Sequence, residues 1–226
     1  MNIRPVSEHV RVHRSLLATV EKRTLIWIAE RLPRWVTSDH LTLLGLLSMF
    51  AAGGLYWAAR WNRAALPLVV VALALNWFGD SLDGTLARVR DMQRPRYGFY
   101  VDHVIDVLGV LFLLGGMALS GFMSPLIALG LLAAYLMVMA EVILATCVLS
   151  IFRLASLGFG PTELRIVLSI GTLCLLRSSV CRIAGMGPFR LFDVGGIVAI
   201  VGLGLVFMLS SIRNTSDLYR AEPLAR

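Results

Sequence analysis

Long apolar stretches separated by short polar segments fill the chain from about residue 40 onward. Each stretch is close to or longer than the ~20 apolar residues that a helix needs to cross a bilayer. The short segments between them carry glycine, proline or charged residues, which are typical of connections between helices. The pattern therefore predicts six transmembrane helices, at residues 41–59, 64–87, 99–121, 125–152, 164–184 and 191–212.

The segment before the first stretch follows a different pattern. Within residues 14–33, apolar side chains such as Leu17 and Trp27 recur at helical spacing, opposite charged residues such as Glu21 and Glu30. This pattern is typical of an amphipathic helix in the membrane interface, where a plain surface anchor is its simplest role. The predicted fold is an all-α integral membrane protein, with this interfacial helix in an N-terminal segment of residues 1–40, six spans in residues 41–212 and a tail of residues 213–226.

Composition supports a membrane protein. The 226 residues are 58% hydrophobic and 15% charged, with a mean hydropathy of +0.78, whereas soluble domains are ~45–50% apolar and ~25% charged. Six spans leave no room for a separate soluble domain. Cys147, Cys174 and Cys181 lack the spacing of metal ligands or of a disulfide framework, so we interpret them as small hydrophobic residues.

The distribution of basic residues predicts the topology. Sixteen of the 21 lie in the N-terminal segment, the second-to-third and fourth-to-fifth loops and the C-terminal tail. Because basic residues are retained on the cytoplasmic side, we expect both termini in the cytoplasm of a multi-pass cell-membrane protein. The first apolar run begins only near Leu41, which argues against a cleaved signal peptide. The net charge of +7 fits an anionic membrane surface and does not imply nucleic acid.

Four aspartates interrupt the apolar sequence where the second predicted span ends and the third begins: Asp80, Asp83, Asp102 and Asp106. A carboxylate at membrane depth costs ~2.5–3.5 kcal/mol, so four of them need a compensating charge or an aqueous cavity. The spacings i, i+3 and i, i+4 place each pair on one helix face, and antiparallel neighbours can bring the two faces together. Oxygen ligands suit Mg²⁺ or Mn²⁺. The sequence therefore predicts that these four residues are metal ligands, sufficient for two ions.

Small residues accompany the aspartates. Gly84 and Ala87 share the stripe of the first pair, and Gly98 and Gly109 share that of the second. They leave room for a ligand, or they serve close packing between spans, which is the commoner reason for small residues in membrane helices. Arg88, at the inner end of the second span, is either a snorkelling topology anchor or a phosphate ligand.

Together these residues form one string, D-x2-D-G-x2-A-R-x9-G-x3-D-x3-D, which resembles the signature of the CDP-alcohol phosphotransferases. All eight fixed positions match, the motif covers 27 residues, and the resemblance extends by architecture over the six spans. The matching residues are Asp80, Asp83, Gly84, Ala87, Arg88, Gly98, Asp102 and Asp106.

The resemblance implies an enzyme of phospholipid biosynthesis. A CDP-linked alcohol would donate a substituted phosphoryl group to a hydroxyl acceptor and release CMP, with two Mg²⁺ or Mn²⁺ ions bound in the six-span catalytic domain. It also implies a homodimer surrounded by membrane lipids. Cleavage of a pyrophosphate needs metal ions to screen the attacking oxygen and to stabilise the departing phosphate, which agrees with the carboxylates.

Roles are carried over from the family by position. Asp80, Asp83 and Asp102 would be metal ligands, and Asp106 either a metal ligand or the base that takes the acceptor proton. Gly84, Ala87 and Gly98 would line the substrate site, and Arg88 would hold phosphate. In place of the family's PNxLT-like element this chain has Ser38, Asp39, His40, Leu41 and Thr42, so that a nucleotide contact would come from Asp39 or Thr42.

His103 makes the wording DHxxD, which resembles the choline and ethanolamine phosphotransferase branch and makes the imidazole a candidate base. However, on a helix His103 points about 100° away from Asp102, as a packing residue would. Asp106 therefore ranks first as base.

Three further polar residues have two interpretations each. Glu141 either faces the catalytic cavity or bonds to another span. Thr162 and Glu163 either cap the fifth span or contact the acceptor.

The acceptor class stays open. A phosphorylated acceptor should need arginines near the site, for which Arg94, Arg96, Arg153 and Arg165 are candidates, whereas DHxxD favours a diacylglycerol-like lipid. Outside the family, an intramembrane prenyltransferase also holds a metal-bound pyrophosphate on aspartates, and a divalent-cation transporter would use buried carboxylates without catalysis.

Overall fold

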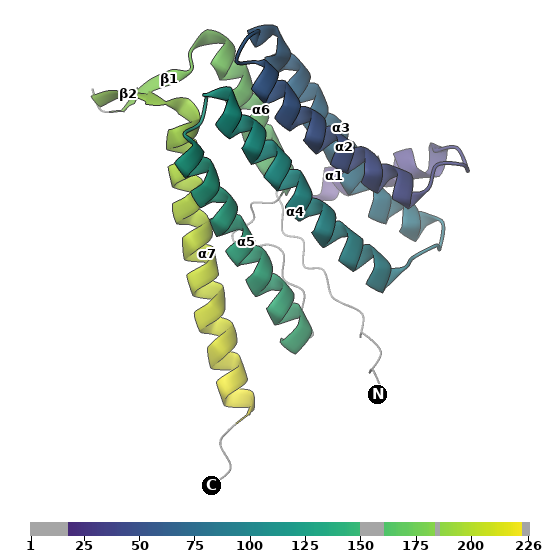
Figure 1. The fold of residues 1–226 in the computed structure, drawn as a ribbon. Helices are drawn as coiled ribbons and strands as arrows, with labels where there is room; N and C mark the ends of the chain where they lie inside the picture. Colours follow the sequence, from purple (N-terminus) through teal and green to yellow (C-terminus); the bar gives the residue numbers. More distant parts are fainter. Residues whose placement is uncertain (1–17, 150–160, 184–185, 223–226) are drawn as a thin grey trace.

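Helices make up most of the structure, a computed structural model that describes residues 18–149, 161–183 and 186–222. A two-stranded hairpin joins the last two helices (Figure 1). The elements are α1 (Ala18–Arg31), α2 (Ser38–Ala58), the 3₁₀ turn η1 (Arg63–Ala65), α3 (Leu66–Val89), α4 (Pro95–Ser120), α5 (Pro125–Leu149), α6 (Pro161–Arg177), β1 (Val180–Ile183), β2 (Met186–Arg190) and α7 (Leu191–Ala221).

Five helices in the described part of the chain are long and apolar enough to cross a membrane: α2, α3 with η1, α4, α5 and α7. They coincide with five of the six predicted spans and confirm a helical protein of membrane type. The count of six spans stays a prediction, because α6 has only 17 residues. The last helix continues past residue 212, the predicted end of the sixth span, as far as Ala221.

The predicted fifth span ends early. Helix α6 stops at Arg177, and Ser178 then bonds to the backbone of Val180 with its side chain as both donor and acceptor. Such local bonds offer the backbone an alternative to the helix. The chain turns into an antiparallel hairpin in which Val180 pairs with Arg190. The hairpin was not predicted, because the fifth span was expected to continue as a helix through residue 184 across Arg177 and the two serines that follow it.

Helix α2 packs closely against both aspartate-bearing helices. A Cβ atom on Gly116 of α4 would lie 2.0 Å from the carbonyl oxygen of Gly53 on α2. A Cβ atom on Gly79 of α3 would lie 2.5 Å from the carbonyl oxygen of Leu41. Both contacts join backbone to backbone, which only glycine allows. These approaches set the spacing of α3 and α4 around the aspartates.

The main hydrophobic core lies toward the other end of these helices. It joins the helices from α2 to α7 through buried side chains, and the hydroxyls of Tyr56 and Thr172 bond within it. Between membrane helices, close van der Waals packing of such side chains supplies much of the attraction. The core residues include Tyr56, Leu66, Leu73, Met117, Leu175 and Phe192.

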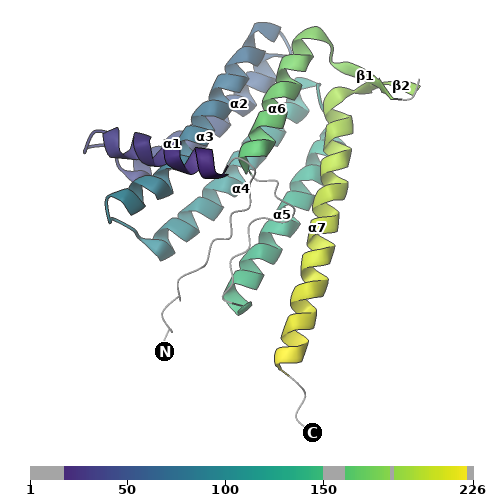
Figure 2. The same cartoon turned by 180° about the vertical axis from the view of Figure 1, so that it is seen from behind.

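Helix α1 lies across the long helices and packs on the end of α3 (Figure 2). Leu25 and Ala29 of α1 contribute to a small core with Leu82 and Leu86 of α3. The side chain of Arg90 joins the two elements further, by donating hydrogen bonds to four carbonyl oxygens, those of Leu32, Pro33, Arg34 and Val36. The helix lies within the range predicted for the N-terminal amphipathic helix; its position at a membrane surface stays a prediction.

Helices α5 and α7 run side by side over most of their length and form a second layer beside α4 (Figures 1 and 2). Helix α7 contacts α5 far more than it contacts α6. Of the two helices that bear the aspartates, α3 therefore packs on α2 and α6, and α4 packs on α2 and α5.

Candidate metal centre

Three of the four aspartates form a compact group. Asp80 on α3 and Asp102 and Asp106 on α4 each offer a carboxylate oxygen, and these oxygens all lie within 4.8 Å of one another. Helices α3 and α4 are joined by a short loop but share few contacts; both pack mainly on α2, and the aspartates meet in the half of each helix nearest the loop. The side chains are partly buried. Three hard oxygen donors at this spacing fit Mg²⁺ or Mn²⁺.

Asp83 lies beside this group but points elsewhere. Its carboxylate accepts a hydrogen bond from Thr42 Oγ1 of α2 at 2.7 Å and another from the backbone N–H of Gly84. Ser38 donates to the Asp83 carbonyl oxygen at 2.8 Å. The expectation of four converging carboxylates is therefore met by three, because α2 holds the fourth.

Arg165 supplies positive charge to the group. From α6 its Nη2 donates to Asp80 Oδ2 at 2.5 Å, and its Nε donates to Asn76 Oδ1 at 2.8 Å. Asn76 in turn donates to the carbonyl oxygen of Gly45 at 3.0 Å, which fixes its orientation. The Arg165 and Asp80 side chains are only 16% and 28% exposed, so this ion pair is poorly screened by solvent.

Asn76 and Tyr135 were missed by the sequence analysis. Asn76 lies one helical turn before Asp80, so an amide on the aspartate stripe was the available signal. Tyr135 of α5 lies close enough to Asp106, Asp102 and Arg165 to interact with them electrostatically. Nothing in its apolar surroundings distinguishes Tyr135 in the sequence.

Four predicted substrate-binding residues lie in the last turns of α3 and the first turn of α4, the end of these helices that is predicted to face the cytoplasm. Arg88 is exposed and donates to Thr85 Oγ1 at 3.0 Å. A Cβ atom on Gly84 would lie 3.4 Å from Arg88 Nη1, and Ala87 is half-buried. Gly98 is exposed, with open space where a side chain would be. These four therefore share the helices of the carboxylate group, and Arg88 and Gly98 are accessible to a ligand.

Asp39 forms an exposed ion pair with Arg94, both of its carboxylate oxygens accepting from Nη2. This hydrogen bond raises the pKa of Arg94 above its ordinary value. The side chains are 54% and 48% exposed for Arg94 and Asp39, so solvent screens the pair and its contribution to stability is small. Of the two residues predicted to contact nucleotide, Asp39 is thus bonded to Arg94 in the α3–α4 loop, and Thr42 is bonded to Asp83.

His103 is directed along its own helix. Its Nδ1 lies 2.8 Å from the carbonyl oxygen of Phe99, and the two rings are 4.2 Å apart. The side chain is 9% exposed. Neither contact involves the carboxylate group, and both are those of a packed residue.

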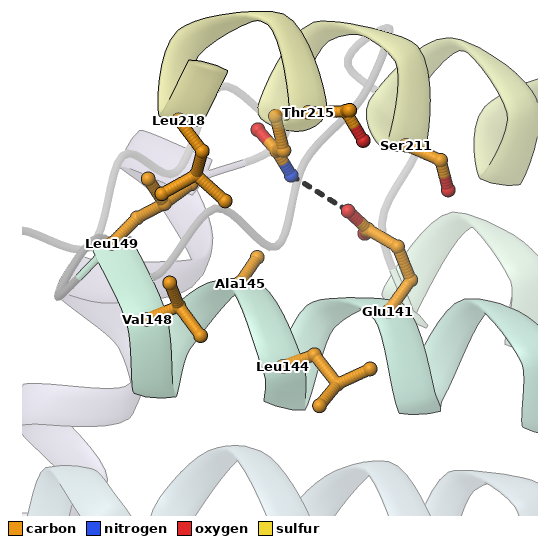
Figure 3. A pocket seen from close by; sticks show the side chains of 9 residues that line it. Glu141, Leu144, Ala145, Val148, Leu149, Ser211, Thr215 and Leu218 are labelled. Atoms are coloured by element: carbon orange, nitrogen blue, oxygen red, sulfur yellow. Dashed lines mark hydrogen bonds between the residues drawn. The ribbon is translucent and has the colours of Figure 1, made fainter. Parts of the chain in front are cut away.

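Glu141 contacts another span. Its Oε1 accepts a hydrogen bond from Asn214 Nδ2 of α7 at 2.6 Å (Figure 3). The bond lies in a groove of about 170 Å³ between α5 and α7, lined mainly by leucine and valine side chains below it and by hydroxyls of α7. None of the lining residues belongs to the carboxylate group. Of its two interpretations, the structure therefore supports the interhelical bond.

Comparison with known proteins adds no relative. No protein-family model matches the chain, and no curated protein matches it. A function is therefore inferred from the carboxylate group, its neighbours and the motif that contains them.

Proposed function

We propose that this chain is a metal-dependent CDP-alcohol phosphotransferase of phospholipid biosynthesis. It transfers a substituted phosphoryl group from a CDP-alcohol to a hydroxyl acceptor and releases CMP. The observation that carries the proposal is the convergence of Asp80, Asp102 and Asp106, whose oxygens lie within 4.8 Å of one another. Two helices that pool carboxylates from this motif are what binding of a nucleotide diphosphate through cations requires.

The carboxylates provide the binding site for the cations. Asp80, Asp102 and Asp106 offer three oxygens, and Asp83 lies within electrostatic range of Asp80 and Asp102. Bound Mg²⁺ or Mn²⁺, two ions in this proposal, would supply stabilisation of the charge that develops on the departing CMP. Arg165, whose Nε donates to Asn76, orients Asp80 through its own hydrogen bond to that carboxylate.

The remaining residues bind and orient the substrates. Gly84, Ala87 and Gly98 leave space for the nucleotide, and Arg88 binds phosphate. Asp106 accepts the proton of the acceptor hydroxyl. The hydroxyl oxygen of the acceptor forms the new bond to phosphorus, and the bond from that phosphorus to the CMP oxygen breaks. Such positioning and charge stabilisation supply most of the catalysis in phosphoryl transfer. Asp39 and Thr42 contact the nucleotide from α2, and His103 is the second candidate for the base.

The proposal places the protein in the cell membrane, with both termini and the active site on the cytoplasmic side. The excess of basic residues in the corresponding segments supports this orientation. Helix α1, which lies across the long helices, would rest in the interface. A homodimer in contact with membrane lipids follows from the resemblance.

The test is release of CMP by the purified protein in lipid nanodiscs, with a panel of CDP-alcohols and acceptors and with Mg²⁺ or Mn²⁺. The acceptors include glycerol phosphate, inositol phosphate and diacylglycerol, so that the panel separates phosphorylated from lipid acceptors. Release that requires both metal and acceptor supports the proposal. No release with any pair contradicts it. Metal uptake by proteoliposomes without nucleotide turnover would favour a transporter, and turnover of a prenyl pyrophosphate would favour a prenyltransferase.

A further inference from the structure

Glu21 of α1 joins three elements through one carboxylate oxygen. Its Oε1 accepts hydrogen bonds from Trp77 Nε1 at 2.9 Å, from Ser81 Oγ at 3.4 Å and from Thr162 Oγ1 at 2.9 Å. Trp77 and Ser81 are one turn apart on α3, and Thr162 is in the first turn of α6. Hydrogen bonds to a charged group are about twice as strong as neutral ones. The contacts exceed what a surface anchor needs, and Thr162 is directed to Glu21.

The start of α6 is thereby attached to α3 at two neighbouring points. Thr162 and Arg165 are three residues apart, on one face of α6. Thr162 reaches α3 through Glu21, and Arg165 reaches it directly at Asp80 and Asn76. Because the two attachments lie within one helical turn, loosening the first allows the second to move.

The second attachment uses a metal ligand. The guanidinium of Arg165 lies 2.5 Å from Asp80 Oδ2, in the same group of oxygens that would bind a cation. A cation must displace this guanidinium or bind close to its positive charge, and both lower the affinity for the cation. A residue that keeps Arg165 at Asp80 therefore tunes metal affinity from outside the site.

We propose that Glu21 is a positioning residue: through Thr162 it holds the start of α6 against α3, keeps Arg165 at Asp80, and so weakens cation binding at the carboxylate group. The inference rests on the metal site of the proposed function. It makes α1, beyond its role as a surface anchor, a part of the active-site assembly.

The experiment measures Mn²⁺ affinity by electron paramagnetic resonance on the full chain in nanodiscs. Thr162→Val removes the hydroxyl donor without changing charge, and we expect Mn²⁺ affinity to rise about two- to threefold. Arg165→Ala should raise it about tenfold, because the competing charge is gone. In the double variant Thr162→Val adds nothing to Arg165→Ala, since Glu21 acts only through Arg165.

Control variants separate this effect from general loosening. Ser169→Ala removes a hydroxyl of the same helix that donates to the Arg165 carbonyl oxygen, within α6 itself, and it should leave Mn²⁺ affinity unchanged. Thr162→Ser keeps the donor and should behave as the wild type. Thr162→Ala removes the same donor and replaces Thr162→Val if that variant does not fold.

The proposal would be overturned if Thr162→Val bound Mn²⁺ as the wild type does or more weakly. It would also be overturned if Thr162→Val changed Mn²⁺ affinity equally in the presence and in the absence of the Arg165 side chain. A wild type that binds no Mn²⁺ would overturn it as well. The two proposals fail separately. If the protein releases CMP but Thr162→Val does not change Mn²⁺ affinity, only the role of Glu21 is refuted. If Thr162→Val and Arg165→Ala are coupled in Mn²⁺ affinity but no CMP is released, only the proposed reaction is refuted.

Discussion

Arg165 and Asp80 are 85 positions apart in the chain, and their side chains meet at 2.5 Å between α6 and α3. The pair balances one of three carboxylates that crowd together at membrane depth, where isolated charges are costly. It also makes α6 part of the site, although α6 contributes none of the clustered acids.

Asp80→Asn should abolish metal-dependent turnover. The substitution keeps the side-chain shape but removes the charge that Arg165 and a cation share, so we expect at least a ~100-fold loss of CMP release. The measurement is CMP release across a range of Mg²⁺ concentrations. Asp91→Asn is the matched control, because Asp91 is exposed in the α3–α4 loop and its positive φ of 54° suits asparagine. Equal loss in both variants would contradict a specific role for Asp80.

Asp106→Asn should separate binding from catalysis. If Asp106 takes the acceptor proton, the amide cannot replace it, and turnover should fall by ~10²–10⁴-fold. Binding of the CDP-alcohol, measured by calorimetry in the presence of Mg²⁺, should weaken much less, since Asp80 and Asp102 remain. Near-normal turnover would remove Asp106 from the role of base and return His103 to consideration.

Asp39→Asn should affect substrate binding more than stability. The ion pair with Arg94 is about half exposed, so solvent screens it and its loss should leave the free energy of unfolding almost unchanged. If Asp39 contacts the nucleotide, KM for the CDP-alcohol should rise with little change in kcat. Steady-state kinetics test this change in KM, and thermal unfolding of the same preparation tests the small effect on stability. An unchanged KM would show that Asp39 only pairs with Arg94.

Gly116→Ala should disrupt the crossing of α2 and α4. The new methyl group would lie 2.0 Å from the Gly53 carbonyl oxygen, so the helices must separate, at a cost of about 1–3 kcal/mol or more. Gly115→Ala is a matched control on the same helix, because nothing lies within 4 Å of its Cβ position. Thermal unfolding in detergent should show a lower midpoint for Gly116→Ala alone. Equal midpoints would contradict the close approach of the two helices.

Arg90→Gln should loosen α1 from α3. The guanidinium donates to the carbonyl oxygens of Leu32, Pro33 and Val36, and glutamine cannot reach all of them. We expect a loss of about 1–3 kcal/mol in the free energy of unfolding, together with faster hydrogen exchange in α1. Arg96→Gln makes the same charge change at an exposed position. A matching loss in that control would attribute the effect to charge alone.

Five membrane-length helices were predictable because an apolar run of sufficient length leaves a chain few alternatives. The convergence of Asp102 with Asp106 was predictable for a similar reason: a spacing of four residues places two side chains on one face of any helix. The pairing of these residues with Asp80 was predicted from the assumption that the short loop makes α3 and α4 packed neighbours. The carboxylates do meet, but the two helices share few contacts and both pack on α2, so α2 rather than the loop places them. These inferences use only distances along the chain.

Contacts between distant segments required the folded molecule. Asp83 accepts a hydrogen bond from Thr42, Glu141 accepts one from Asn214, and Arg165 donates to Asp80. Each of these contacts depends on how one helix is rotated and shifted against another. Helical periodicity determines which residues share a face, but it does not determine which other helix that face packs against. That choice is made by the packing of whole surfaces, such as the glycine contacts of α2, which sum many small interactions across the chain.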